Sequence, residues 1–156
     1  LLMDMAAEAG FEQYEISNFA KKQSYSRHNT SYWKGITYLG LGPSSHSYNG
    51  NLRRWNIGRL DAFIHAIENH TSFSEEEILT ENDKYNDYII TGIRTKWGIS
   101  LDFIRKNFGE KKAGNLMKNI RKYTETGKII QHQHTFKLSR EGIFVSDNIM
   151  ADLMII

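Results

Sequence analysis

The sequence contains no cysteine among its 156 residues and no long apolar run. Without thiols the segment cannot form disulfides, thiolate metal sites or the cysteine ligands of an iron–sulfur cluster. The absence of disulfides suits a reducing compartment, so we expect a cytoplasmic protein. No stretch approaches the roughly 20 apolar residues that span a bilayer, and no signal-peptide pattern opens the chain. We therefore expect no transmembrane segment.

What is present is ordinary globular composition with an uneven charge distribution. Hydrophobic residues make up 40% and charged residues 24% of the chain, which excludes a disordered protein. The net charge of +2 divides into −4 for residues 1–93, +7 for residues 94–128 and −1 for residues 129–156. A local basic stretch of this kind indicates nucleic acid, a membrane surface, an acidic partner or a solvated helix face.

The first 57 residues show strand-like patterning and one clear helix, at the start. The chain begins without Met inside a helix that Gly10 closes, so we expect a piece of a longer protein. Short strands are predicted near residues 14–17, 38–42 and 53–57, the second as a buried strand that ends in a small-residue loop. Gly40 and Gly42 would allow another group to approach the backbone closely.

From Gly58 onward the pattern is helical. Apolar spacing predicts helices over 60–67, after Thr80, after Ser100 and over 111–126, with Thr80 a better helix start than Ser74. The acidic residues 75–77 are interpreted as a helix-start run. A two-stranded ribbon follows over 128–138, with a turn near Gln133, and Ser139 is expected to cap a last helix. Three helices followed by a ribbon predict a winged-helix-like domain, and the fold class is α+β.

The densest group of reactive side chains lies between Ser26 and Trp33. It places His28, Asn29, Tyr32 and Trp33 within six positions. Two aromatic side chains in a loop beside an imidazole suit a flat apolar ligand with one coordinating atom, such as haem. The alternative is that the aromatic residues belong to the core and that His28 orients a loop.

A second group, residues 42–48, follows the predicted strand. His46 could face a ligand there, because ligands of α/β folds gather at the carboxyl ends of strands, or it could complete a tight turn. His132 and His134 point the same way on a strand, but a metal site needs further ligands, so we expect a solvated ribbon and no metal. We find no catalytic signature.

Cationic residues line one face of the predicted 111–126 helix. They suggest either a groove-reading helix or the wet face of a long surface helix. Few side chains there suit base edges, so we expect no nucleic acid partner and interpret the face as a docking surface. Its members are Lys111, Asn115, Lys118, Lys122 and the adjacent Arg121.

Consecutive blocks of the sequence resemble the oxygen-independent coproporphyrinogen III oxidase-like radical SAM proteins. The His-Asn-x-x-Tyr-Trp block resembles their haem-chaperone, or HemW-type, branch, and the later blocks resemble their carboxy-terminal domain. The blocks are residues 9–20, 26–33, 38–43, 46–48 and 53–56, then 92–95, 98–99 and 138–142. One departure is Ser44-Ser45, where the family commonly has Gly-Ala. Because Ser adopts positive φ less readily than Gly, we expect a differently shaped loop before His46.

The resemblance implies that residues 1–57 form the carboxyl end of a radical SAM partial (β/α) barrel and residues 58–156 a helical winged-helix-like domain. The four-iron four-sulfur cluster and S-adenosylmethionine sites of such a parent would lie outside this chain. The resemblance further implies a fragment that binds haem through His28, Asn29, Tyr32, Trp33 and His46 and delivers it to client haem proteins. The alternatives are a fragment of a true coproporphyrinogen oxidase of porphyrin biosynthesis and a winged-helix nucleic-acid-binding module. Exposed strand edges would also permit a dimer.

Overall fold

The computed structural model describes residues 1–155 and divides them into two compact units. One unit is discontinuous and joins residues 1–34 to residues 85–155; the other comprises residues 35–84. This division follows compactness alone, so the assignment of residues 1–57 to a barrel and 58–156 to a second domain stays a prediction. Within residues 1–155, no helix has the length and apolar character needed to cross a membrane.

The N-terminal segment contains two helices and one hairpin. Helix α1 (Leu2–Glu8) ends before Gly10, whose φ of 78° is the left-handed conformation expected of a helix-closing glycine. Strands β1 (Phe11–Glu15) and β2 (Asn18–Lys21) pair antiparallel. Helix α2 (Arg27–Trp33) follows, capped by the Ser26 hydroxyl, which accepts from the Asn29 backbone N–H at 3.2 Å. The sequence prediction of a single helix in this region was therefore wrong.

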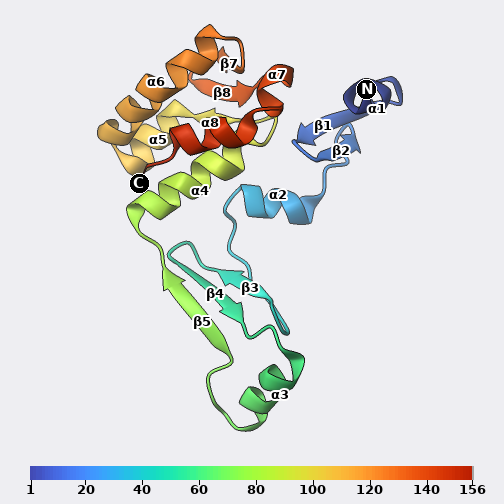
Figure 1. The fold of residues 1–156 in the computed structure, drawn as a ribbon, viewed down its shortest axis with the longest axis vertical. Helices are drawn as coiled ribbons and strands as arrows, with labels where there is room; N and C mark the ends of the chain where they lie inside the picture. Colours follow the sequence, from blue (N-terminus) through green and yellow to red (C-terminus); the bar gives the residue numbers. More distant parts are fainter. Residues whose placement is uncertain (156) are drawn as a thin grey trace. The chain divides into compact units, whose positions relative to one another are not determined.

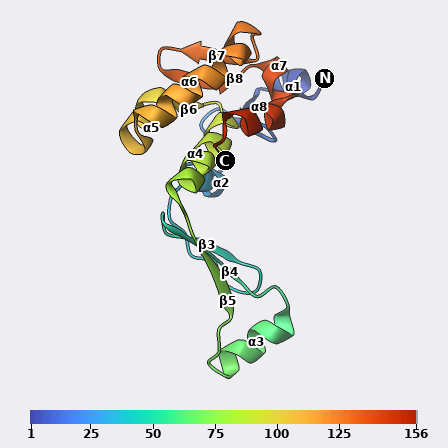
Figure 2. The ribbon, with the colours of Figure 1, turned by 60° about the vertical axis from the view of Figure 1, so that its left-hand side comes forward.

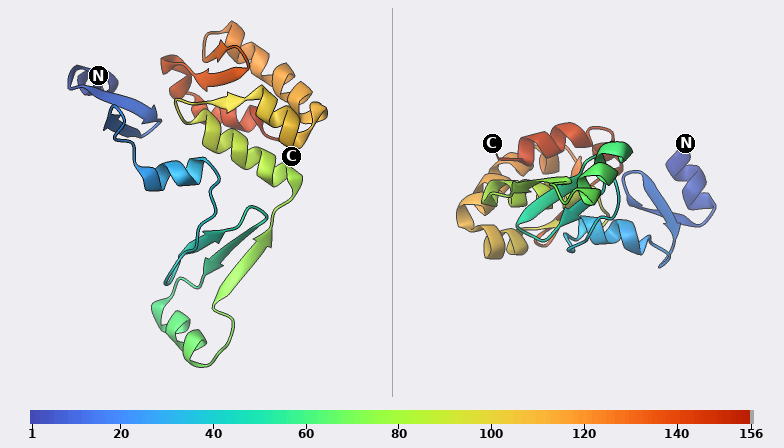
Figure 3. Two further views of the ribbon diagram at one scale, coloured as in Figure 1. Left: turned by 180° about the vertical axis from the view of Figure 1, so that it is seen from behind. Right: turned by 90° about the horizontal axis from the view of Figure 1, so that it is seen from below.

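The C-terminal domain, residues 81–155, alternates helices with a small antiparallel sheet (Figures 1 and 3). The sheet has the order β6-β8-β7, so that the first strand pairs with the last. The elements, in chain order, are α4 (Glu81–Ile93), β6 (Ile99–Ser100), α5 (Leu101–Phe108), α6 (Glu110–Glu125), β7 (Ile129–His132), β8 (Thr135–Leu138), α7 (Arg140–Ile143) and α8 (Ser146–Leu153). The predicted helices and ribbon, and the α+β class, are confirmed; the winged-helix designation stays a prediction.

Most of the hydrophobic core lies in this domain. The helices α4, α5, α6 and α8 each contribute apolar side chains at helical spacing, and the sheet contributes Ile99, Ile129 and Phe136. The side chains that are less than 2% exposed include Tyr85, Ile89, Ile93, Ile104, Leu116, Ile120, Ile149 and Leu153. The Tyr85 hydroxyl donates to the Leu153 carbonyl oxygen at 3.2 Å, and burial raises the pKa of Tyr85 to about 12.

Local signals define the ends of these elements. Thr80 and Asp83 form a reciprocal cap at the start of α4, with the Thr80 N–H donating to the Asp83 carboxylate at 2.8 Å. The Ser100 hydroxyl caps α5, and Gln133 turns the ribbon with a φ of 52°. Ser139 caps only α7, because the chain leaves the helix near Val145 before α8 begins. The single last helix that the sequence predicted is therefore two helices.

The unit of residues 35–84 contains an antiparallel sheet of order β3-β4-β5. Its strands are β3 (His46–Tyr48), β4 (Leu52–Asn56) and β5 (Ser74–Ile78), and helix α3 (Leu60–Glu68) connects the last two. Figure 2 shows α3 beyond the end of this sheet and not over either face. The sheet faces are consequently not covered by a helix of their own unit.

Two sequence predictions in this unit were wrong. Residues 38–42 do not form a buried strand: Tyr38 makes an isolated bridge to Tyr48, and Leu39 and Leu41 are 69% and 81% exposed. The acidic residues 75–77 do not start a helix but lie in β5, where Glu76 and Glu77 face Arg54 and Arg53 of β4. Opposite charges across paired strands favour this register over a helix.

Candidate functional site

Helix α2 carries four of the five predicted site residues and presents them on two different faces. At about 100° per residue, His28 and Tyr32 lie one turn apart on one face, while Asn29 and Trp33 share another. The exposure agrees with this, because His28 and Tyr32 are exposed whereas Asn29 and Trp33 are half-buried. The predicted loop aromatics are therefore helix residues with two separate roles.

The exposed face presents a paired imidazole and phenol. The Tyr32 hydroxyl lies 3.1 Å from His28 Nε2, and the two rings meet edge to face with centroids 4.9 Å apart. The other ring nitrogen, Nδ1, makes no hydrogen bond within the described residues. A hydroxyl at Nε2 orients the ring, so Nδ1 is the nitrogen of this exposed side chain that could bind a metal or donate a proton.

The adjacent face of α2 anchors the helix to the hairpin. Asn29 Nδ2 donates to Asn18 Oδ1 at 3.4 Å, and the Trp33 ring packs edge to face against Tyr14, centroids 5.7 Å apart. Tyr14 is 3% exposed, and its hydroxyl accepts from the Ser26 backbone N–H. Trp33 therefore packs against the hairpin, whereas Tyr32 is 40% exposed, and the roles predicted for both residues stay predictions.

The anchor continues into an aromatic cluster that joins the N-terminal segment to the C-terminal domain. Tyr25 packs against Tyr14 at 4.9 Å and against Trp97 at 5.7 Å between ring centroids. Lys96 Nζ lies 4.5 Å from the Tyr25 centroid and donates to Glu12 at 2.6 Å. These hydrogen bonds from Lys96 and from the Tyr25 hydroxyl hold the pKa of Glu12 below its ordinary value.

Two more ion pairs also join the N-terminal segment to the C-terminal domain. Glu15 is 3% exposed, and its carboxylate accepts from Arg94 at 2.9 Å and from the Ser17 N–H. Asp4 of α1 accepts two hydrogen bonds from the Arg140 guanidinium, at 2.5 and 2.7 Å, which lowers the pKa of Asp4. The N-terminal segment is therefore fixed to the C-terminal domain at three separate points.

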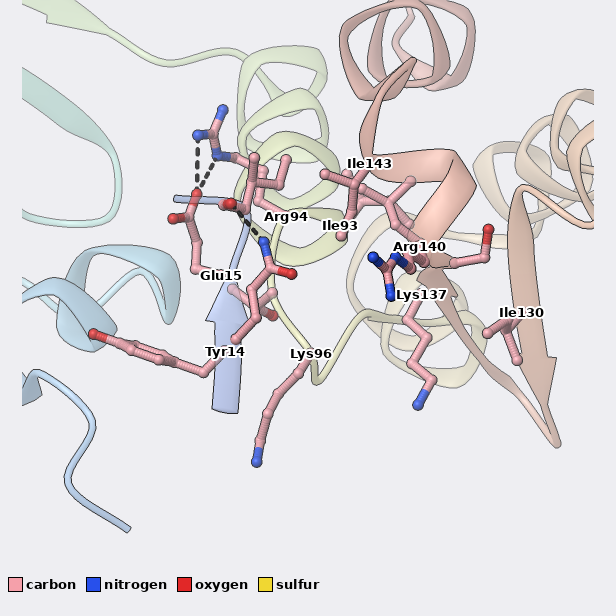
Figure 4. A pocket seen from close by; sticks show the side chains of 14 residues that line it. Tyr14, Glu15, Ile93, Arg94, Lys96, Ile130, Lys137, Arg140 and Ile143 are labelled. Carbon is pink, nitrogen blue, oxygen red and sulfur yellow. Dashed lines mark hydrogen bonds and ion pairs between the residues drawn. The ribbon is translucent and has the colours of Figure 1, made fainter. Parts of the chain in front are cut away.

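A shallow pocket of about 190 Å³ lies between β1 and the C-terminal domain (Figure 4). Its walls combine apolar side chains, such as Ile93 and Ile143, with four cationic side chains. The cations are Arg94, Lys96, Lys137 and Arg140. Sequence reasoning had selected none of them, because they come from distant segments that share no motif.

His46, the fifth predicted site residue, lies in the other unit on β3. Its exposed ring is opposite Trp55 of β4, with centroids 6.4 Å apart. The preceding Ser44 has a φ of 58°, so this serine adopts the left-handed conformation that a glycine would favour. Gly40 allows the close approach that was predicted, since a Cβ there would lie 2.2 Å from the His46 carbonyl oxygen.

The basic face of α6 is partly neutralised. Lys122 donates to Asp152 of α8, whose other donor is the Tyr123 hydroxyl at 2.5 Å, and Arg121 pairs with Glu125 at 2.7 Å. Lys111 and Lys118 have no acidic partner within residues 1–155. Two such cations are fewer than a phosphate-tracking surface requires, so the geometry does not strengthen the nucleic-acid alternative.

The residues present decide which cofactors fit this chain. With no cysteine anywhere in the sequence, it offers none of the thiolates that hold an iron–sulfur cluster. Among residues 1–155, no three His, Asp or Glu side chains converge to hold a metal ion. A haem needs a nitrogen ligand and apolar or aromatic surface, of which the exposed His28–Tyr32 pair could supply the imidazole and one aromatic ring.

Comparisons with known proteins extend along the whole chain. Residues 79–145 match the model of the HemN C-terminal domain. The chain is 27% identical to the haem chaperone HemW of Bacillus subtilis over 96% of its length, which is 40% of that protein. It is 29% identical to the mitochondrial radical S-adenosyl methionine domain-containing protein 1 of Bos taurus, covering 94% of the chain and 36% of that protein.

A solved structure shares the fold. The coproporphyrinogen III oxidase HemN of Escherichia coli, a radical SAM enzyme, superposes with a TM-score of 0.76 at 13% identity, over 98% of this chain and 39% of that one. The chain thus spans about two fifths of the length of the proteins it matches. Taken with the matched C-terminal domain, these similarities support the assignment of the chain to the C-terminal part of a HemN- or HemW-like radical SAM protein.

Proposed function

We propose that this chain is the part of a haem chaperone that holds haem on the exposed face of α2, with His28 Nδ1 as the axial ligand. The observation that carries the proposal is the His28–Tyr32 pair, in which one imidazole nitrogen lies 3.1 Å from the Tyr32 hydroxyl and the other makes no hydrogen bond within residues 1–155. The names of several curated relatives, haem chaperones among them, support the same function.

The roles of the neighbouring residues follow from their contacts. Tyr32 would accept a hydrogen bond from Nε2–H, which selects the tautomer whose Nδ1 lone pair is free and orients the ring. Asn29 and Trp33 would act as positioning residues, because they attach α2 to the hairpin through Asn18 and Tyr14. Haem bound in this way would supply an iron centre to a client haem protein, while the exposure of His28 leaves the group accessible for release.

A haem titration tests the proposal. The chain is titrated with haem while the Soret band is recorded, and the His28→Ala variant is compared with His132→Ala, in which another exposed imidazole, on β7, is removed. We expect saturable binding that weakens about tenfold or more in His28→Ala, with a shifted Soret maximum, and is unchanged in His132→Ala.

The Tyr32→Phe variant separates ligation from orientation. It keeps the ring and removes the hydroxyl, so we expect the Soret position of the wild type with binding weakened only severalfold. Identical titrations for the wild type and His28→Ala would contradict the proposal. Far-UV circular dichroism of each variant checks that α2 and the rest of the fold are intact.

A second candidate is that the chain is part of a true coproporphyrinogen oxidase, because its fold is shared with an enzyme of that activity. Product analysis of an intact protein that contains this chain separates the two. Conversion of coproporphyrinogen III would support the oxidase, whereas haem transfer to an apoprotein without that conversion would support the chaperone.

A further inference from the structure

The pocket between β1 and the C-terminal domain contains one cation whose charge is not already compensated. Arg94, Lys96 and Arg140 pair with Glu15, Glu12 and Asp4, respectively. Lys137 of β8 forms no ion pair with any residue from 1 to 155. A ligand carboxylate could therefore pair with Lys137 without breaking an ion pair that holds the N-terminal segment in place.

The walls beside Lys137 favour a ligand with a short aliphatic part. The half-buried Ile143 presents an apolar wall, and Ile130, which is 46% exposed, adds a further apolar side chain on the β7 side. Figure 4 shows Lys96 and Lys137 extending in the same direction from opposite walls. At about 190 Å³ the pocket is smaller than the sites that accept drug-sized ligands, so only a small molecule or the edge of a larger one fits.

We propose that this pocket binds a short aliphatic carboxylate, with Lys137 as its charge partner and the isoleucines against its alkyl chain. The same chemistry occurs in a free short-chain acid and in the propionate edge of a tetrapyrrole. The second source rests on the proposed haem function, whereas the first does not depend on it.

The test uses sodium propionate as the probe, with propionamide as its uncharged counterpart. Backbone amide resonances of the ¹⁵N-labelled chain are followed during each titration at constant ionic strength. We expect saturable shifts for residues that line the pocket, among them Thr95, Ser139 and Ile143, with propionate only. In Lys137→Gln the affinity should fall about fivefold or more, while Lys137→Arg should retain it.

The matched control is Lys118→Gln, which removes an exposed and equally unpaired lysine of α6 and should bind propionate like the wild type. The proposal is overturned if no pocket amide shifts saturably, if propionamide produces the same shifts, or if Lys137→Gln binds as well as the wild type. Haem titration of Lys137→Gln then identifies the source. If Lys137→Gln, in which His28 is intact, binds haem more weakly than the wild type, the carboxylate is the tetrapyrrole edge. If it binds haem as well as the wild type, the carboxylate is a free acid. Loss of haem binding in His28→Ala alone does not affect the propionate result.

Discussion

The C-terminal domain and the unit of residues 35–84 use their apolar side chains in different ways. In the C-terminal domain the apolar positions of α4, α5, α6 and α8 converge on one core, and nine of them are almost fully excluded from water. In the other unit Ala66 and Leu79 are buried, but Leu41, Leu60 and Ile78 are 81%, 62% and 78% exposed.

The difference shows that regular secondary structure does not require a core of its own. The sheet of residues 35–84 is held by its backbone ladders, by the Arg53–Glu77 pair at 3.6 Å and by the Phe63–Phe73 ring contact. Each such contact contributes roughly 1 kcal/mol or less, whereas burial of a Leu or Ile side chain contributes about 1.5–3 kcal/mol. We therefore expect this unit to open more readily than the C-terminal domain.

The largest expected effect is a contrast between two isoleucines. Ile89→Ala removes a fully buried side chain from α4, so the free energy of unfolding should fall by about 3–4 kcal/mol. Ile67→Ala removes a 46% exposed side chain from α3, so the free energy of unfolding should change by about 0.5 kcal/mol or less. Urea unfolding of both variants checks this, and similar losses would mean that the two units do not differ as described.

The next effect concerns the attachment of the N-terminal segment. Arg94→Met leaves the buried Glu15 carboxylate without its cation, although Ser17 and Asn18 still donate to it, so about 2 kcal/mol should be lost. The control Arg121→Met breaks an exposed pair and should cost about 0.5 kcal/mol or less. Hydrogen exchange should show the loss in residues 1–34 and 85–155. Faster exchange confined to residues 35–84 would contradict the assignment of Glu15 to this attachment.

A smaller effect should follow from acid. The folded-state pKa of Glu12 lies below its ordinary value of 4.5, so its contribution to stability is fully present above that value and is lost as pH falls through the lowered pKa. Below about pH 4 the N-terminal segment should loosen, and the fluorescence of Trp33 and Trp97 should change before the C-terminal core unfolds. In Glu12→Gln this early fluorescence change should be reduced, and an unaltered pH profile would show that the Lys96 pair does not contribute.

The smallest effect is expected at the turn before β3. The positive φ of Ser44 strains the backbone. Ser44→Gly removes that strain but also increases the conformational freedom of the unfolded chain. The net change should be a stabilisation of about 0.5 kcal/mol, measured by urea unfolding. Ser45→Gly, one position away from the strained residue, should instead destabilise the protein slightly.

The helices of the C-terminal domain were predictable because their signals are local. Thr80, Ser100 and Ser139 cap helices whose apolar residues recur at helical spacing, and Gln133 lies at the predicted turn. Such patterns depend on a few neighbouring residues, so the helices and the turn can be predicted from the sequence alone.

The features that were missed depend on distant partners. Helix α2 lacks an apolar period, and its stability comes from the Ser26 cap and from the packing of Trp33 on Tyr14. The acidic strand β5 is defined by the arginines of β4, twenty or more residues earlier. The His28–Tyr32 spacing suggests a shared face only once the segment is known to be helical. The cations of the pocket likewise meet only in the folded chain.

The discontinuous unit also has a consequence for the order in which the protein can assemble. Glu15 is 79 positions before its partner Arg94, and Asp4 is 136 positions before Arg140. During synthesis from the amino terminus, the first 34 residues leave the ribosome long before the domain that receives them. Contacts of such long sequence separation form slowly, so docking of residues 1–34 should follow the folding of the C-terminal domain.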